Sequence, residues 1–123
     1  QKMNQSIWED LETAVRGWSS GIDTLYVVTG AMPTTATDKQ IQYAQDNNGK
    51  NIAIPKYYFK ALARKVGGNY QTIAFKLDHK AYGDTQYMKY AISVSELENM
   101  TGFTFFPSLP SEVKKTLNTS QWN

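Results

Sequence analysis

The chain has 123 residues, a formal net charge of +2 and a pI near 8.8, and 41% of its residues are hydrophobic. This length and apolar content predict one globular domain with a modest core and exclude an intrinsically disordered chain. The absence of cysteine excludes disulfide bonds and thiolate metal sites. No apolar run approaches the roughly 20 residues of a membrane span. The mildly basic charge permits a polyanionic partner without requiring one.

The first predicted element is an amphipathic helix over residues 5–18, which ends in Ser19-Ser20-Gly21. The apolar residues that recur at helical spacing are Ile7, Leu11, Ala14, Val15 and Trp18. They form a buried stripe and leave the flank of the helix free for polar groups. Asn4, Glu12 and Arg16 lie within roughly 120° of each other around the helix axis. We therefore expect all three to project toward one polar cleft.

These three side chains suit metal-assisted chemistry on phosphate. An amide oxygen and a carboxylate are ligands for a hard cation such as Mg²⁺, which keeps most of its waters. The guanidinium of Arg16, one turn beyond Glu12, is placed to clamp a phosphate oxygen. Taken alone, the spacing also fits simpler structural roles: Asn4 as a helix N-cap and Glu12 with Arg16 as a surface ion pair.

The next segments read as a strand and a long loop. Leu25–Thr29 is rich in β-branched and aromatic residues and precedes Gly30, a pattern that predicts a buried strand. Residues 31–51 are polar and predict a loop with one helical turn near its middle.

Residues 57–66 are compatible with two different elements. Their apolar side chains follow a helical spacing, with Gly67-Gly68 as a C-terminal stop. In the alternative, the segment is a strand whose side chains alternate between two faces. Lys56, Lys60 and Arg64 then share one face, either as solvated surface or as candidate phosphate contacts.

The C-terminal third predicts short elements. Residues 87–92 read as a strand, and Ser93 with Glu96 forms a capping box for a helix that runs to about Met100 and ends at Gly102. Three phenylalanines are expected to be core residues: Phe103, Phe105 and Phe106. A last helix is expected over residues 111–117, followed by a tail that contains Trp122.

Five blocks in a fixed order carry a family resemblance. They are Asn4-Gln5 with Trp8, Leu11-Glu12 and Arg16; Asp23 to Gly30; Ile54 to Lys60; Ala74-Phe75; and Ile92 to Glu98 with Thr101-Gly102 and Phe106-Pro107. In this order they resemble the DNA/RNA non-specific endonucleases, a family of ββα-metal (His-Me finger) nucleases. The blocks cover nearly the whole chain. Ser6 and His79-Lys80 depart from the family pattern.

The resemblance implies a fold. In the family, a proline followed by aromatic residues and a lysine introduces a strand, so residues 57–66 are expected to pair with residues 70–77 across a turn at Gly67-Gly68-Asn69. The class is α+β, with an antiparallel sheet flanked by helices. The chain would form part of a ββα-metal nuclease fold and lack some strands of the sheet.

The resemblance also implies a function, namely a Mg²⁺-dependent (or Mn²⁺-dependent) endonuclease that hydrolyses phosphodiester bonds of both DNA and RNA. In this reading Asn4 binds the metal ion directly. Glu12 holds the ion through a bound water, and Arg16 stabilises the charge that develops on the phosphate.

One hallmark of the family is missing. The Asp-Arg-Gly-His motif, whose histidine is the general base, lies upstream of the asparagine helix in family members and does not occur in this chain. The single histidine, His79, is expected to be an exposed residue at a strand end. We therefore expect residues 1–123 to be the C-terminal part of one endonuclease domain, inactive or nearly so by itself.

The resemblance also bears on partners and location. DNA and RNA would be the substrates, and the chain would associate with the N-terminal part of the same protein or with a second copy of itself. A secreted or periplasmic location is expected from the resemblance alone. The alternative function is a non-catalytic module on the same scaffold that binds nucleic acid or protein.

Overall fold

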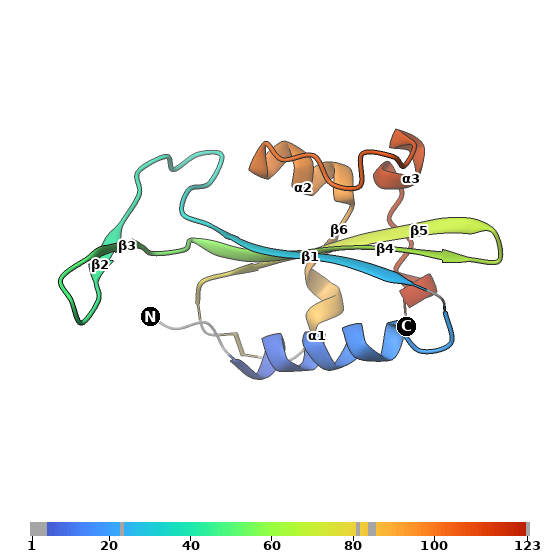
Figure 1. Ribbon diagram of the computed structural model, residues 1–123, viewed down its shortest axis with the longest axis horizontal. Coiled ribbons are helices and arrows are strands. Elements are labelled where there is room, and N and C mark those ends of the chain that lie inside the picture. Colours follow the sequence, from blue (N-terminus) through green and yellow to red (C-terminus); the bar gives the residue numbers. More distant parts are fainter. Residues whose placement is uncertain (1–4, 23, 81, 84–85, 123) are drawn as a thin grey trace.

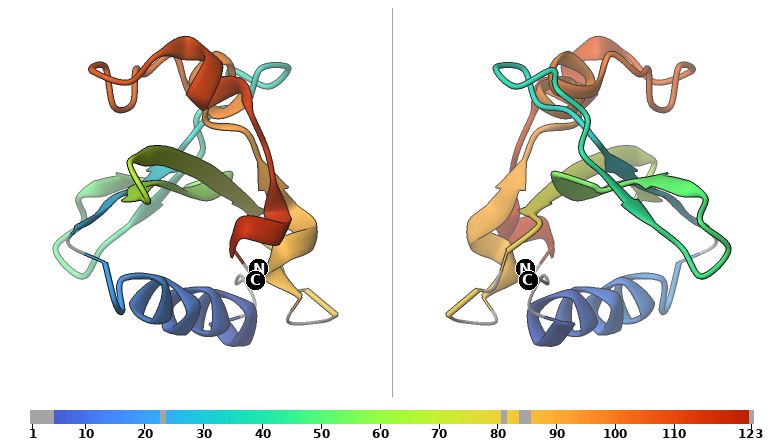
Figure 2. Two further views of the ribbon diagram at one scale, coloured as in Figure 1. Left: turned by 90° about the vertical axis from the view of Figure 1, so that its right-hand side faces the viewer. Right: turned by 90° about the vertical axis from the view of Figure 1, so that its left-hand side faces the viewer.

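A computed structural model describes residues 5–22, 24–80, 82–83 and 86–122. It has three layers (Figure 1). The N-terminal helix α1 (Gln5–Trp18) crosses one face of an antiparallel sheet, and α2 (Val94–Thr101) and α3 (Ser111–Lys115) cover the other face. The two end-on views in Figure 2 show the same order of layers. The predicted α+β class is therefore confirmed.

The main sheet has four strands in the order β1-β4-β5-β6. Their bounds are Leu25–Met32, Tyr57–Val66, Asn69–Asp78 and Ala91–Ile92. The predicted hairpin is confirmed, because β4 and β5 pair in register from Val66↔Asn69 to Tyr57↔Asp78. Its turn is Gly67-Gly68, with φ of 59° and 85°. Positive φ at both central residues is typical of a tight hairpin turn and explains why two glycines stand there.

Alternate residues of the hairpin build a core on each side of the sheet. Leu62 and Ile73 face α1 and pack with Ile7 and Leu11, all of them fully buried. On the other face, Phe59, Ala61 and Ala74 pack with Val94, Leu97 and Phe105. Ile7 and Leu11 are one helical turn apart, so the predicted apolar stripe is what seats α1 on the sheet.

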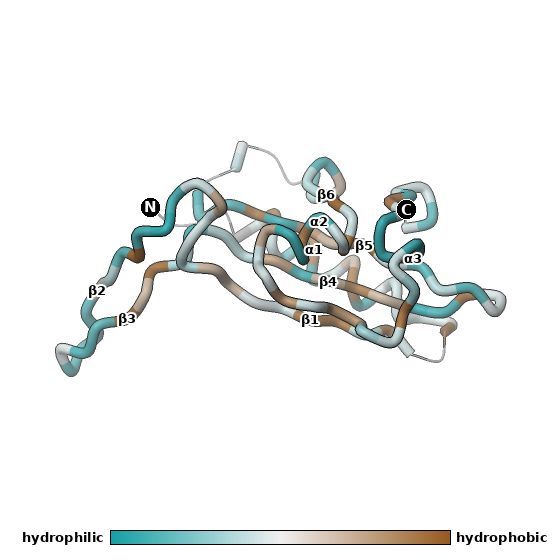
Figure 3. Tube along the Cα trace, turned by 90° about the horizontal axis from the view of Figure 1, so that it is seen from above, coloured by the Kyte–Doolittle hydropathy of each residue, from teal (hydrophilic) through white to brown (hydrophobic). Residues whose placement is uncertain are grey.

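The first strand differs from the prediction of a buried strand. β1 pairs only with β4, which places it at the edge of the described sheet. Tyr26, Val27 and Val28 are 55%, 38% and 39% exposed. Figure 3 shows this strand along one long edge of the molecule, with hydrophobic residues in its course. The composition indicated a strand correctly, but burial depends on neighbours that this part of the sheet does not have.

Residues 33–56 form an extended arm that projects beyond the sheet (Figure 1). The expected helical turn is wrong: the arm contains a small hairpin of β2 (Tyr43–Gln45) and β3 (Asn51–Ala53). Asp46 closes its tip, since Oδ1 accepts hydrogen bonds from the amides of Asn48 and Lys50 at 2.8 and 2.9 Å. An Asp side chain that replaces backbone partners in this way favours a turn over a helix.

The C-terminal third also brings corrections. Residues 87–92 are a 3₁₀ turn, η1 (Tyr87–Tyr90), followed by the short β6, rather than one strand. Helix α2 is confirmed, with Ser93 Oγ accepting from the Glu96 amide at 3.1 Å and Gly102 at φ 79°. Phe105 is buried and Phe106 packs on the core, whereas Phe103 is 52% exposed.

The end of the chain returns to α1. Helix α3 is shorter than expected, and a 3₁₀ turn, η2 (Thr119–Trp122), follows it. The indole N–H of Trp18 donates to the carbonyl of Trp122 at 2.6 Å, and the two rings meet edge to face. Arg64 stacks on the Trp122 ring, with its Cζ atom 3.9 Å from the ring centroid. These contacts fasten the C-terminal end of α1 to the sheet.

At Gly30 the absence of a side chain lets the Phe59 ring lie close to the β1 backbone, so we expect a substitution there to lower stability strongly. It lies opposite Phe59 in the β1–β4 pairing, and a Cβ atom at Gly30 would lie 2.5 Å from Phe59 Cζ. Because Phe59 is packed in the core, Gly30→Ala is expected to destabilise the fold by about 1–3 kcal/mol. A methyl group at Gly17 in α1 would meet only open space, so Gly17→Ala is expected to stabilise by up to about 1 kcal/mol. Urea unfolding of the two variants should give shifts of opposite sign, and equal shifts would contradict this packing.

Candidate functional site

Glu12 extends from α1 toward the sheet. It follows the buried Leu11, so its side chain lies at the border between the core stripe and solvent and is 45% exposed. Its Oε2 atom lies 3.0 Å from Nζ of Lys60 on β4. Lys60 of the sheet therefore holds one oxygen of the Glu12 carboxylate, while part of the side chain remains exposed to solvent.

Lys60 is buried beneath the helix, with its side chain only 4% exposed. Besides Glu12, its ammonium donates to Thr29 Oγ1 at 3.0 Å and lies 4.7 Å from the ring centroid of Trp8. Thr29 is the cross-strand neighbour of Lys60, and Trp8 lies one helical turn before Glu12. We call Trp8, Glu12, Thr29 and Lys60 the α1–sheet cluster.

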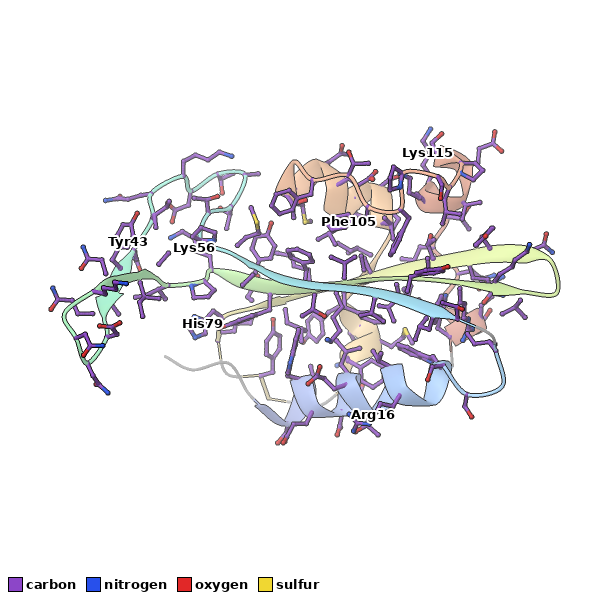
Figure 4. The ribbon with its side chains drawn as sticks, in the orientation of Figure 1. Arg16, Tyr43, Lys56, His79, Phe105 and Lys115 are labelled. Atoms are coloured by element: carbon purple, nitrogen blue, oxygen red, sulfur yellow. The ribbon has the colours of Figure 1, made fainter. Side chains whose placement is uncertain are left out.

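The other two residues of the predicted trio are placed differently. Arg16 lies on the exposed flank of α1 (Figure 4), where its Nη2 donates to Thr13 Oγ1 at 3.1 Å. The ion pair of Glu12 is therefore with Lys60 and not with Arg16, so the simple surface pair is wrong. Asn4 lies outside the described residues, and both its interpretations, metal ligand and N-cap, stay predictions.

The three basic residues do not form one exposed stripe. Lys56 lies just before β4, and its Nζ pairs with Asp38 Oδ2 at 3.2 Å. A hydrogen bond from the Gln40 amide, and after it the contact with Lys56, lowers the pKa of the Asp38 carboxyl group. Lys60 belongs to the α1–sheet cluster. Arg64 donates to Gln71 Oε1 at 3.0 Å and stacks on Trp122, and burial lowers the pKa of its guanidinium. Lys56 lies just outside β4, and each of the three residues has a different partner.

His79 follows β5 at the same end of the sheet as Lys56 (Figure 4). It is partly buried rather than exposed, because Nδ1 lies 2.8 Å from the Pro55 carbonyl and the ring meets Tyr58 edge to face. Its amide also donates to the Lys56 carbonyl at 2.9 Å. These contacts give His79 a structural role in joining two segments.

A divalent cation at this site would be held by few protein ligands. The described residues contain no group of three or more His, Cys, Asp or Glu side chains that could hold a metal ion. Mg²⁺ keeps several waters and is commonly bound through one or two protein oxygens. The partly exposed, oriented carboxylate of Glu12 fits the task of holding a metal-bound water.

A helix that carries a carboxylate across one face of an antiparallel sheet is consistent with a ββα-metal nuclease domain. A family model described as DNA/RNA non-specific endonuclease matches residues 1–112. The chain belongs to this family, as the resemblance predicted.

The chain is also similar to individual nucleases. It is 30% identical over 115 residues to "Nuclease EXOG, mitochondrial" from Mus musculus, a match that covers 86% of this chain and 31% of that protein. It is 24% identical over 112 residues to "Endonuclease G, mitochondrial" from Homo sapiens, covering 87% of this chain and 38% of that protein. The chain thus spans about a third of the length of these curated relatives. Among the described residues, no helix is long and apolar enough to cross a membrane.

The α1–sheet cluster could be anticipated only in part. Trp8 and Glu12 stand four residues apart on the predicted helix, and the resemblance selected Glu12. Thr29 carried no signal of its own. Its part in the cluster follows from the β1–β4 register, which the sequence does not reveal.

Proposed function

We propose that the chain is the C-terminal part of a metal-dependent endonuclease that hydrolyses phosphodiester bonds in both DNA and RNA. Family membership and the nuclease names of the relatives support a nuclease. The observation that carries the site is the Glu12 carboxylate, which Lys60 orients at a surface that remains open to solvent.

Each polar residue of the helix has a proposed role. Asn4 would hold the cation through its amide oxygen, and Glu12 would accept a hydrogen bond from a water in the coordination shell. Arg16 would turn from Thr13 to the substrate and donate to a phosphate oxygen. When bound, Mg²⁺ or Mn²⁺ supplies charge stabilisation for the leaving oxygen.

Lys56 is our candidate for an additional phosphate contact. Its partner Asp38 has a 55% exposed side chain, so a phosphate could replace that carboxylate from solvent. Lys60 is buried in its ion pair, and the partly buried Arg64 is engaged with Gln71 and Trp122. Both would contribute to phosphate binding only through the long-range field of their charges.

The general base would come from the part of the protein that precedes this chain. That part would complete the sheet next to β1 and supply the Asp-Arg-Gly-His motif. Export of the protein remains our expectation from the family resemblance, while the relatives named above are mitochondrial. The location of a tagged protein in its native cell would decide between these compartments.

A nuclease assay on the whole protein tests the function. With Mg²⁺ present, we expect cleavage of supercoiled plasmid and of a structured RNA, and loss of both activities in EDTA. Glu12→Gln should lower activity, whereas Glu96→Gln, at an exposed position on α2 across the sheet, should not. Tight binding of DNA or RNA with no cleavage in any divalent metal would instead favour the non-catalytic binding module.

A further inference from the structure

Lys60 is a charged residue in a place where charge is costly. An ammonium group removed from water must be paired and hydrogen-bonded if the fold is to tolerate it. Lys60 meets this requirement fully, since its three N–H donors have three partners: Glu12 Oε2, Thr29 Oγ1 and the face of the Trp8 ring. A lysine that served only to steer nucleic acid would not need such a setting, because surface exposure would suffice.

The geometry points to Lys60 as a positioning residue that orients the Glu12 carboxylate toward the metal-bound water. This inference rests on the proposed function and goes beyond it, because it assigns a role to a residue that touches neither metal nor substrate. The Lys60 backbone is fixed between β1 and β5, and Thr29 holds its ammonium from the neighbouring strand. A rigid strand thus determines where one oxygen of a flexible helix side chain lies.

Fixing the orientation of this carboxylate in advance lowers the entropic cost of metal binding. A half-exposed Glu side chain loses rotamer entropy when it is immobilised, which is a free-energy cost. In this protein the ion pair fixes Glu12 before any ligand binds, so that cost does not have to be met during metal binding. Trp8 covers the ammonium from the helix side, which leaves the Glu12 carboxylate as the solvent-exposed member of the pair.

Metal binding without nucleic acid provides the test. Mn²⁺ affinity of the whole protein is measured by electron paramagnetic resonance, so that the readout does not depend on turnover. Glu12→Gln is expected to weaken Mn²⁺ binding by about 10- to 100-fold, and Lys60→Met by about 10-fold. In the double variant, Lys60→Met should add little to Glu12→Gln, because Lys60 acts through that carboxylate.

Two further sets of variants make the result specific. Lys76→Met removes a similar lysine, which pairs with Asp78 at 3.0 Å on the opposite face of the sheet, and should leave Mn²⁺ affinity unchanged. If Lys60→Met fails to fold, Thr29→Val removes one partner of the ammonium and should weaken Mn²⁺ binding less than Glu12→Gln does. Thr29→Ser keeps the hydroxyl group and should restore wild-type affinity.

The outcomes separate this inference from the function on which it rests. Weaker Mn²⁺ binding in Glu12→Gln, with wild-type binding in both Lys60→Met and Thr29→Val, would overturn the positioning role and leave the metal role of Glu12 intact. Additive losses in the double variant would also overturn it, because Lys60 would then act independently. Wild-type Mn²⁺ affinity in Glu12→Gln would remove the proposed metal role of Glu12 and the inference with it.

Discussion

Asn4→Ala is expected to abolish most of the nuclease activity of the whole protein, with a loss of at least about 10³-fold. In the proposed mechanism Asn4 is the only residue that would bind the cation directly. The cation would stabilise the leaving oxygen. Glu12→Ala should have a different signature. The loss of an outer-shell partner is expected to weaken metal affinity by about 10- to 100-fold, so that added Mg²⁺ recovers part of the activity.

Metal titration of plasmid cleavage distinguishes the two effects. For Glu12→Ala the half-saturating Mg²⁺ concentration should rise, whereas for Asn4→Ala the maximal rate should fall. Asn99→Ala provides a matched control, since Asn99 is an exposed amide on α2, across the sheet from α1. Wild-type turnover with wild-type metal dependence in both site variants would show that the helix does not carry the metal site.

The chain expressed alone is expected to be inactive and to associate, either with the preceding part of the protein or with itself. Loss of a general base typically costs 10²- to 10⁴-fold in rate, before lost phosphate contacts are counted. The association should use β1, an edge strand of eight residues with exposed Tyr26, Val27 and Val28. Unpaired edges of this kind readily pair with another strand.

Size-exclusion chromatography with mass measurement tests this association. The chain alone should elute as a dimer or larger species, and addition of the preceding segment should restore nuclease activity. Val28→Lys should reduce both effects by placing a charge on the edge. Leu117→Lys, at a residue that is 41% exposed and distant from β1 in sequence, is the control. A stable monomer of 13.9 kDa that gains no activity from the preceding segment would contradict the proposal.

The sequence was most informative where a pattern determines its own structure. The stripe of α1 needs only helical spacing, and the Ser93 cap with Gly102 needs only local backbone chemistry, so both elements were predicted almost to the residue. The β4–β5 hairpin was harder, because its apolar spacing also suited a helix. Family resemblance favoured the strand, and in the structure Gly67-Gly68 form its hairpin turn with two positive φ values.

The remaining errors concern properties that depend on distant neighbours. The composition of β1 predicts a strand but cannot reveal that no described strand lies beyond it. Alternation along the strand placed Lys60 in one group with Lys56 and Arg64. Its burial, however, depends on how α1 crosses the sheet, which brings Trp8 and Glu12 over this one lysine. Lys56 and Arg64 have other partners, Asp38 and Gln71.

The contact between Trp18 and Trp122 makes the packing of helix α1 on the sheet visible to spectroscopy. The two indoles meet at 5.3 Å with planes 82° apart, and Trp18 also stacks on Phe75 of the sheet. Such fixed aromatic neighbours give a near-ultraviolet circular dichroism signal that disappears when the packing loosens. The near-ultraviolet circular dichroism signal of the unlabelled protein therefore reports the position of α1. Metal or substrate that shifts the helix would change this signal.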